Sequence, residues 1–365
     1  MTNIIQDGHK ENEVIKLPPK SSIKSMQYDL FSQFMTNDVE VVSNTVEYWE
    51  RIPKYFFTAA KTEKMRTVDG LAQSYSYEYT AKNKTGYDVQ YKVKIHPALI
   101  EQSDGKDKAF FPTKTEETIE EVLKKIFTDQ QYGIHDSKNT ESWVRFSYSL
   151  VRRELYNMGN SLRYDQIKHS LEIMSKTVLT VYENGNEIYT GAILQDYCSV
   201  DRNKYLNDRD AQHVARLPVF ISQALNTLQY RQYNYKRFME CKEQLTRYLY
   251  KRLIHRFTNA SHTTYYHFMY SDIKQASGLL QQAREVDNRK KVISSLDELK
   301  QHSVILNYNI DEYKRGRCIT DIKYTVYSCS EFVTEQKAAN KRSNEGKMKA
   351  IKAGLIPNPL REYLK

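Results

Sequence analysis

The chain has 365 residues, which is enough for two or three domains with sizeable cores. Its mean hydropathy is −0.72, and it contains no apolar run of the length that a membrane-spanning helix requires, which excludes a helical membrane protein. The four cysteines are widely spaced and form no Cys-x-x-Cys pair, so we expect free thiols in a cytoplasmic protein and no zinc site.

The formal net charge of +10 is concentrated in two segments. Residues 230–256 hold eight Lys or Arg against two Glu, and residues 337–365 again hold eight against two. A localised surplus of this kind predicts a polyanionic partner better than an even distribution would. Neither segment is a strongly amphipathic helix with exposed Trp or Leu, so a nucleic acid is favoured over an anionic membrane.

The chain is predicted to open with a flexible arm and a β-hairpin. Residues 1–42 contain several charges and no apolar signal core. Residues 43–57 allow a short helical stretch that a proline stops. Residues 73–81 and 87–95 alternate Tyr or aliphatic residues with polar ones around a turn-forming loop, which is typical of a hairpin.

Three helices and a second hairpin are expected next. Thr113 and Glu116 match a capping box ahead of a clear apolar stripe. A second helix is predicted over residues 144–158, and a third begins at Asp165. The dipeptide Asn184-Gly185 between two β-rich runs predicts a tight hairpin. Three helices followed by a hairpin is the order of a winged helix.

The second half of the chain is predicted to repeat this order. A polar linker and a connecting helix lead into a long basic helix with apolar residues from Leu245 to Phe257. A strand from Tyr265, a short helix capped by Ser271 and a longer helix capped by Asp287 follow. A second long hairpin closes this half of the chain.

The position of the cations in this second half is informative. With Asp287 as the cap, Arg289, Lys290 and Lys291 fall in the first turn of the helix, where each opposes the helix dipole by roughly 0.3–1 kcal/mol. A helix that points its first turn at DNA would need cations there, whereas a solvated basic cap is the alternative interpretation. The tip of the following hairpin adds further cations, which are Lys314, Arg315 and Arg317.

No sequence pattern indicates catalysis. The chain has no Gly-x-x-x-x-Gly-Lys-Ser/Thr, no Gly-x-Ser-x-Gly, no His-Glu-x-x-His and no His-x-His beside a tyrosine. Its acidic residues form no clustered pair that would hold two metal ions. We therefore expect a protein that is not an enzyme and has no cofactor, with a DNA-nicking enzyme as a disfavoured alternative.

The sequence resembles the winged-helix replication initiators of bacterial plasmids and secondary chromosomes. The first stretch that carries the resemblance is Ser43-Asn44-Thr45-Val46-Glu47-Tyr48-Trp49-Glu50-Arg51-Ile52-Pro53-Lys54-Tyr55. The second consists of Trp143-Val144-Arg145-Phe146-Ser147, Arg153-Glu154-Leu155, Ile167, Leu171 and Ile173-Met174-Ser175. The resemblance covers about residues 43–332. In the second half it lies in the architecture more than in the identity of the residues.

The resemblance implies an α+β fold of two tandem winged-helix domains with an N-terminal β-hairpin extension. The implied division is a flexible N-terminal arm (1–42), a first winged-helix domain with its hairpin, for dimerisation and DNA binding (43–200), a linker and connecting helix (201–228), a second winged-helix domain as the main DNA-binding part (229–333) and a basic C-terminal tail (334–365). We expect the tail to be mobile or partly helical, and either solubilising or in contact with DNA.

The resemblance also implies a function. Such proteins bind direct repeats, called iterons, in double-stranded DNA at an origin, help to open an AT-rich region, and bring in the host initiator and the replicative helicase. Their first domain often forms a homodimer that represses the protein's own gene, so a winged-helix transcriptional regulator is the main alternative.

By this resemblance, the helix after residue 287 would read the major groove and the hairpin tip would lie on the backbone or in a minor groove. Lys168 and Lys176 in the first domain, with His169 and Glu172, would either read a second groove or be solvated. The full set of expected DNA-binding residues is Arg289, Lys290, Lys291, Ser294, Lys314, Arg315, Arg317, Arg247, Lys251, Lys168 and Lys176.

Overall fold

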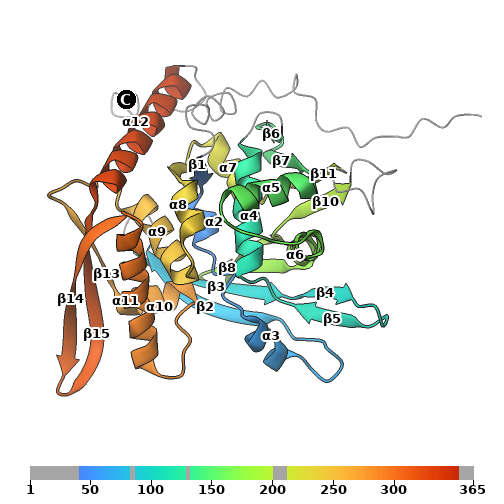
Figure 1. Ribbon diagram of the computed structural model, residues 1–365, viewed down its shortest axis with the longest axis horizontal. Coiled ribbons are helices and arrows are strands. Elements are labelled where there is room, and N and C mark those ends of the chain that lie inside the picture. The colour runs from blue at the N-terminus through green and yellow to red at the C-terminus, as the bar shows by residue number, and fades with distance from the viewer. Residues whose placement is uncertain (1–40, 83–86, 129–131, 200–211, 353–365) are drawn as a thin grey trace, which may run out of the picture.

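The computed structural model describes residues 41–82, 87–128, 132–199 and 212–352 (Figure 1). Our expectations for the N-terminal arm, the first hairpin turn, most of the polar linker and the end of the tail lie outside these ranges. The elements up to residue 199 are β1 (Val42–Thr45), α2 (Glu47–Glu50), α3 (Ala59–Met65), β2 (Tyr75–Lys82), β3 (Asp88–His96), β4 (Ala98–Glu101), β5 (Asp107–Phe110), α4 (Lys114–Phe127), β6 (Gly133–Asp136), β7 (Glu141–Phe146), α5 (Tyr148–Asn157), α6 (Tyr164–Lys176), β8 (Val178–Glu183), β9 (Asn186–Ala192) and β10 (Gln195–Ser199).

The described second half of the chain contributes a similar mixture of helices and strands. Its elements are β11 (His213–Arg216), α7 (Val219–Asn226), β12 (Arg231–Asn234), α8 (Tyr235–Glu240), α9 (Gln244–Arg256), β13 (Tyr265–Met269), α10 (Tyr270–Ser277), α11 (Glu285–Gln301), β14 (Ile305–Arg315), β15 (Cys318–Ser328) and α12 (Ser330–Lys352). The fold therefore mixes helices and antiparallel strands, which confirms the predicted combination of α and β elements.

The strands form several small antiparallel sheets. One sheet has the order β2-β3-β8-β9, a second β10-β11-β7-β6 and a third β13-β15-β14, and two further pairs are β1-β12 and β4-β5. We call α4, β6, β7, α5, α6, β8 and β9 the first unit, and α9, β13, α10, α11, β14 and β15 the second unit. The second unit occupies the left of the view in Figure 1 and the first unit the right. A single apolar core extends through both units.

Local signals in the first unit are largely confirmed. Thr113 and Glu116 form the expected capping box at the start of α4. The hairpin β8–β9 turns at Asn184 and Gly185, whose φ angles of 48° and 84° are left-handed, as an Asn-Gly turn requires. The helix expected over residues 144–158 is shorter, because its beginning is the strand β7. In β7 every second side chain is buried, and a strand followed by a helix capped at Ser147 reproduces the same apolar spacing.

The expected helix starts in the second unit are wrong. Ser271 is not a cap: its N–H and hydroxyl donate to the Asp321 carboxylate at 3.1 and 2.6 Å, inside helix α10. Helix α11 begins at Glu285 and not after Asp287. The Asn288 side chain explains the earlier start, because it exchanges hydrogen bonds with the Gln282 backbone at 2.9 and 3.1 Å and so closes the preceding turn.

The first turn of α11 therefore holds no cation that would oppose the helix dipole. Glu285 and Asp287 occupy its first turn, where acidic side chains are favoured, and the three cations from Arg289 onward lie in the second turn. Contact of these cations with DNA therefore depends on their exposure and position alone.

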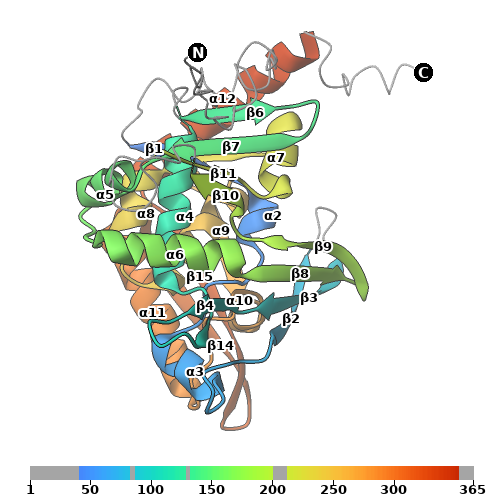
Figure 2. The ribbon, with the colours of Figure 1, turned by 90° about the vertical axis from the view of Figure 1, so that its right-hand side faces the viewer.

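The predicted basic tail begins inside an ordered helix. Helix α12 buries Phe332, Gln336 and Ala339 against the rest of the protein, and Arg237 and Asn234 hold its Glu335 at 2.6 and 2.9 Å. Its far end packs on the segment before β12. In Figures 1 and 2, α12 crosses the top of the molecule, at the opposite end from the tip of β14–β15.

A buried histidine in β11 makes stability depend on pH. His213 is 1% exposed and stacks on Tyr148 with ring centroids 4.4 Å apart, and burial lowers its pKa to about 4. The unfolded chain takes up this proton near its ordinary pKa of about 6.5, so stability is present at neutral pH and is lost as the pH falls from there.

For this one histidine we expect a loss of about 2 kcal/mol of unfolding free energy between pH 7.5 and pH 5. Urea unfolding at both pH values measures it. In His213→Phe, which keeps an aromatic ring, the pH dependence should be smaller by that amount. An identical pH dependence in the variant and the natural protein would exclude this role for His213.

Candidate nucleic-acid interface

Helix α11 has one buried side and one exposed stripe. Val292, Leu296 and Leu299 are fully buried, and α11 packs against α9 and β14. On the other side Lys290 and Ser294 are exposed four residues apart. Val286, which is 55% exposed, lies one turn earlier on the same stripe. Sequence reasoning missed Val286, although an apolar residue off the buried stripe is a signal that could have found it.

The other two cations of α11 are turned away from this stripe. Lys291 donates to the Leu279 carbonyl at 3.2 Å, and burial lowers the pKa of its ammonium. It therefore ties α11 to the end of the preceding turn. Arg289 is half-buried beside β15, where burial raises the pKa of Tyr324 to about 12 and the charge of Arg289 opposes the rise. Of the four residues expected on this helix, Lys290 and Ser294 have the exposure that a DNA contact needs.

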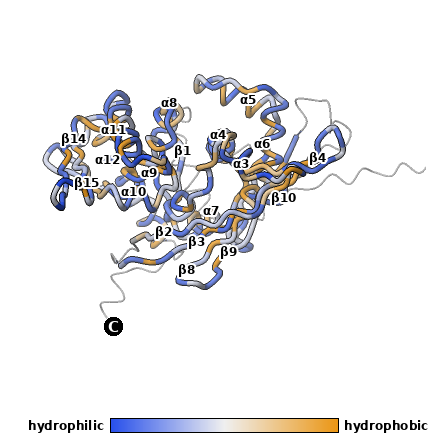
Figure 3. Tube along the Cα trace, turned by 90° about the horizontal axis from the view of Figure 1, so that it is seen from below, coloured by the Kyte–Doolittle hydropathy of each residue, from blue (hydrophilic) through white to orange (hydrophobic). Residues whose placement is uncertain are grey.

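The hairpin β14–β15 presents its cations at an exposed tip. Arg315 pairs with Cys318 in the ladder, and Gly316, with a φ angle of 62°, makes the turn. Lys314, Arg315 and Arg317 are all exposed. Lys314 pairs with Glu312 at 2.7 Å, whereas the two arginines form no ion pair within the described residues. Figure 3, seen from below, shows the outer end of this hairpin as hydrophilic.

One hydrogen bond fixes the hairpin to the helix. The Tyr308 hydroxyl of β14 donates to the Asp297 carboxylate of α11 at 2.8 Å. The exposed stripe of α11 and the cationic tip are thus carried by one packed body. We call the stripe Val286, Lys290 and Ser294, together with the tip Lys314, Arg315 and Arg317, the candidate interface.

Helix α6 of the first unit offers a weaker surface. Lys168 and Lys176 are exposed, but Lys176 pairs with Glu172 of the same helix at 2.7 Å. The hairpin β4–β5 covers one flank of α6. There the rings of His169 and Phe110 pack edge to face, with their centroids 4.7 Å apart. Groove reading and solvation therefore both stay predictions for α6.

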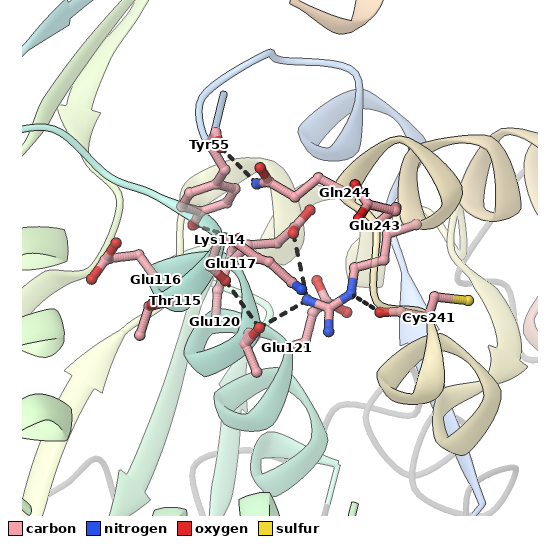
Figure 4. A network of polar contacts seen from close by, with 12 residues as sticks. Tyr55, Lys114, Thr115, Glu116, Glu117, Glu120, Glu121, Cys241, Glu243 and Gln244 are labelled. Carbon is pink, nitrogen blue, oxygen red and sulfur yellow. Dashed lines mark hydrogen bonds and ion pairs between the residues drawn. The ribbon is translucent and has the colours of Figure 1, made fainter. Parts of the chain in front are cut away.

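Arg247 and Lys251 do not belong to a surface, which corrects their assignment to DNA. Arg247 is 2% exposed and donates to the Cys241 carbonyl and the Thr118 hydroxyl at 2.9 and 2.8 Å. Lys251 is 6% exposed and lies between Glu50 and Glu121 at 2.7 and 2.6 Å. Helix α9 turns its leucines to one side and these two cations toward the carboxylates of α4. Figure 4 shows the neighbouring carboxylates Glu117, Glu120 and Glu121 converging on this region.

Other kinds of site find little support. A cavity of about 720 Å³ lies between residues 47–56, strand β2 and the second unit. Several of its cations are engaged, as in the ion pair of Arg256 with Glu47 at 2.6 Å. Within the described residues no cluster of three His, Cys, Asp or Glu side chains could hold a metal ion. The described helices include none with the length and hydropathy to cross a bilayer.

The candidate interface makes a prediction within a single helix. We expect Lys290→Ala to weaken binding to a specific DNA site by about 1–3 kcal/mol if the ammonium meets a base edge. Lys300→Ala, which removes an exposed lysine from the last turn of the same helix, should leave binding unchanged. Fluorescence anisotropy with a labelled duplex compares them, and equal losses in the two variants would remove the α11 stripe from the interface.

Comparison with known proteins gives structural similarities at low identity. No protein-family profile matches the chain, and no curated protein matches it. The chain is similar to domains 2 and 3 of RctB, with 12% identity, a TM-score of 0.43, and coverage of 73% of this chain and 98% of that one. A second structure of RctB domains 2–3 is 10% identical with a TM-score of 0.38, and the match covers 73% of this chain and 95% of that one. The Pi initiator protein in complex with iteron DNA is 13% identical with a TM-score of 0.34, and the match covers 59% of this chain and 91% of that one. At these values, function has to be inferred from this chain's own residues.

Proposed function

We propose that the protein is a replication initiator that binds repeated sequences in double-stranded DNA through the candidate interface. The observation that carries this proposal is the pairing of an exposed helix stripe with an exposed arginine tip on one packed unit. A helix in the major groove with a neighbouring hairpin on the backbone needs these two surfaces side by side.

The topology of the second unit supports this proposal. Its order is helix, strand, helix, helix and hairpin, and β15 lies between β13 and β14. We infer that this is a winged helix, with α11 as the reading helix and β14–β15 as the wing. Arg315 and Arg317 would neutralise phosphates, while Lys290 and Ser294 would face base edges.

The first unit is proposed as a second, modified winged helix. Its helices α4, α5 and α6 precede the hairpin β8–β9, but that hairpin pairs with β3 and β2 and not with a strand of the unit itself. From the sequence resemblance we infer that this unit contacts a second DNA segment and forms a homodimer. We further propose that the protein opens the origin and recruits the host initiator and helicase. We propose that it does so in the cytoplasm, without catalytic activity or a cofactor.

A footprint on DNA that includes the non-coding region beside the gene tests the proposal. We expect protection of several direct repeats, lost steeply as salt rises because phosphate contacts release counterions. Protection of one palindrome alone would favour the alternative of a transcriptional autorepressor. No protection at any site, or protection that does not change with salt, would contradict DNA binding through this basic surface.

A further inference from the structure

Six charged side chains meet in the interior between the two units. Lys124 of α4 lies 2.7 Å from Glu50, 3.3 Å from Glu120 and 2.8 Å from Glu121. Lys251 of α9 lies 2.7 Å from Glu50 and 2.6 Å from Glu121. The Lys54 ammonium donates to the Trp49 carbonyl at 2.8 Å and interacts with the charges of Glu50 and Glu120. We call Glu50, Lys54, Glu120, Glu121, Lys124 and Lys251 the buried charge cluster. It contains three carboxylates and three ammonium groups.

The cluster joins three separate segments of the chain. Glu120, Glu121 and Lys124 come from α4 of the first unit, and Lys251 comes from α9 of the second. Glu50 comes from α2, ahead of both units, and bridges the two lysines. Neutral donors complete the arrangement, since Tyr55 donates to Glu120 at 2.7 Å, Tyr233 donates to Glu121 at 2.6 Å and Trp49 also donates to Glu120.

Glu50, Glu121 and Lys124 stay charged although they are buried. Burial opposes ionisation of Glu50, but Lys124 and Lys251 outweigh it and hold the pKa of this carboxyl well below its usual range. Burial likewise opposes the charge on Lys124, and its three carboxylate neighbours raise its pKa well above the ordinary value. Buried charges of this kind are tolerated only while every partner is in place.

Apolar packing and ion pairing constrain the two units differently. The shared apolar core holds the units together, but hydrophobic attraction is non-directional and allows neighbouring arrangements of similar energy. A shift of α9 along α4 by one helical turn would re-pair only one cation, either Lys251 with Glu117 or Arg247 with Glu121. The other cation would be left buried without a carboxylate. The best-attested role of buried polar groups is to select one register between packed elements.

We propose that the buried charge cluster fixes the register of the two units and thereby sets the spacing of the two DNA segments that the protein reads. This proposal rests on the proposed function, because it takes both units to contact DNA. Lys251 and Glu121 are thus positioning residues: they act through the placement of α11 and α6 and not by touching the nucleic acid.

The test uses a charge-balanced variant of the full chain, Glu121→Gln with Lys251→Met. The matched control is Asp196→Asn with Arg216→Met, which removes a partly exposed pair between β10 and β11, 2.5 Å apart. Affinity is measured on the footprinted site with none, one or two base pairs inserted between the protected segments. Each insertion moves one segment by roughly 3.4 Å and 34° relative to the other.

We expect the natural protein and the control to lose about tenfold or more in affinity per inserted base pair, following the rotation of one segment out of reach. The cluster variant should bind the natural spacing more weakly and lose less than about threefold on insertion, since its units can adjust. A folded cluster variant with the natural spacing dependence would overturn the proposal. Failure of the natural protein to bind DNA would instead reject the proposed function.

A second readout needs no DNA. Spin labels at Tyr156 of α5 and Lys300 of α11, both exposed, report the distance between the units. We expect a narrow distribution in the natural protein and the control, and a broad one in the cluster variant. Should that variant fail to fold, Glu50→Gln with Lys124→Met removes the other balanced pair and carries the same expectation. A narrow distribution in a folded variant would overturn the register role.

Discussion

Arg315→Ala together with Arg317→Ala should weaken binding of duplex DNA by about tenfold or more at moderate salt and lower the slope of log affinity against log salt by roughly two. Both guanidinium groups are exposed at the tip of β14–β15 and form no ion pair within the described residues, so they are free to meet phosphates. Fluorescence anisotropy at several salt concentrations measures the affinity and the slope.

The matched control removes two exposed cations from the other end of the molecule. Lys337→Ala with Lys341→Ala changes net charge equally, but on α12, which lies at the top in Figures 1 and 2. We expect little change in affinity for this control. An equal loss in both double variants would mean that total charge, and not the hairpin tip, determines binding, and would support α12 as the DNA-touching arm.

The second large effect is on stability. Arg247→Ala should lower the free energy of unfolding by about 3–5 kcal/mol, because it removes one partner of a buried charged network. Its guanidinium donates to the Cys241 carbonyl and the Thr118 hydroxyl and lies 3.5 Å from the Glu117 carboxylate. Burial already raises the pKa of Glu117 against the opposing charge of Arg247, so the variant would leave this carboxyl without its main support.

Urea unfolding followed by circular dichroism measures the effect of Arg247→Ala. The comparison is Arg153→Ala, an exposed arginine on α5, whose change should stay within about 0.5 kcal/mol. A loss below about 1 kcal/mol in Arg247→Ala would contradict its role as a buried network residue and would return it to the set of candidate DNA contacts.

Features determined by neighbouring residues could be predicted from the sequence. The capping box of Thr113 and the hairpin at Asn184-Gly185 depend on residues that lie within a few positions of one another. The exposed tip of β14–β15 follows equally from a turn between two β-rich runs. These local patterns fix the types of the elements and their order along the chain.

Features determined by distant residues could not be predicted. Arg247 and Lys251 look like a solvated face of α9, because the carboxylates that bury them lie about 130 residues earlier in α4. The start of α11 was missed for a related reason: the side chain of Asn288 closes the turn before it, which a search for N-cap residues does not detect. Lys291 and Arg289 are cations by sequence, and packing alone removes them from the exposed stripe.

The contact of α11 with DNA can be measured by photo-crosslinking. A benzoylphenylalanine placed at Ser294 should form a covalent adduct with the footprinted duplex on irradiation, since this position lies on the exposed stripe of α11. The same group at Met348, which is 55% exposed on α12, should form none. Adducts from Met348 alone, or equal yields from both positions, would contradict the candidate interface.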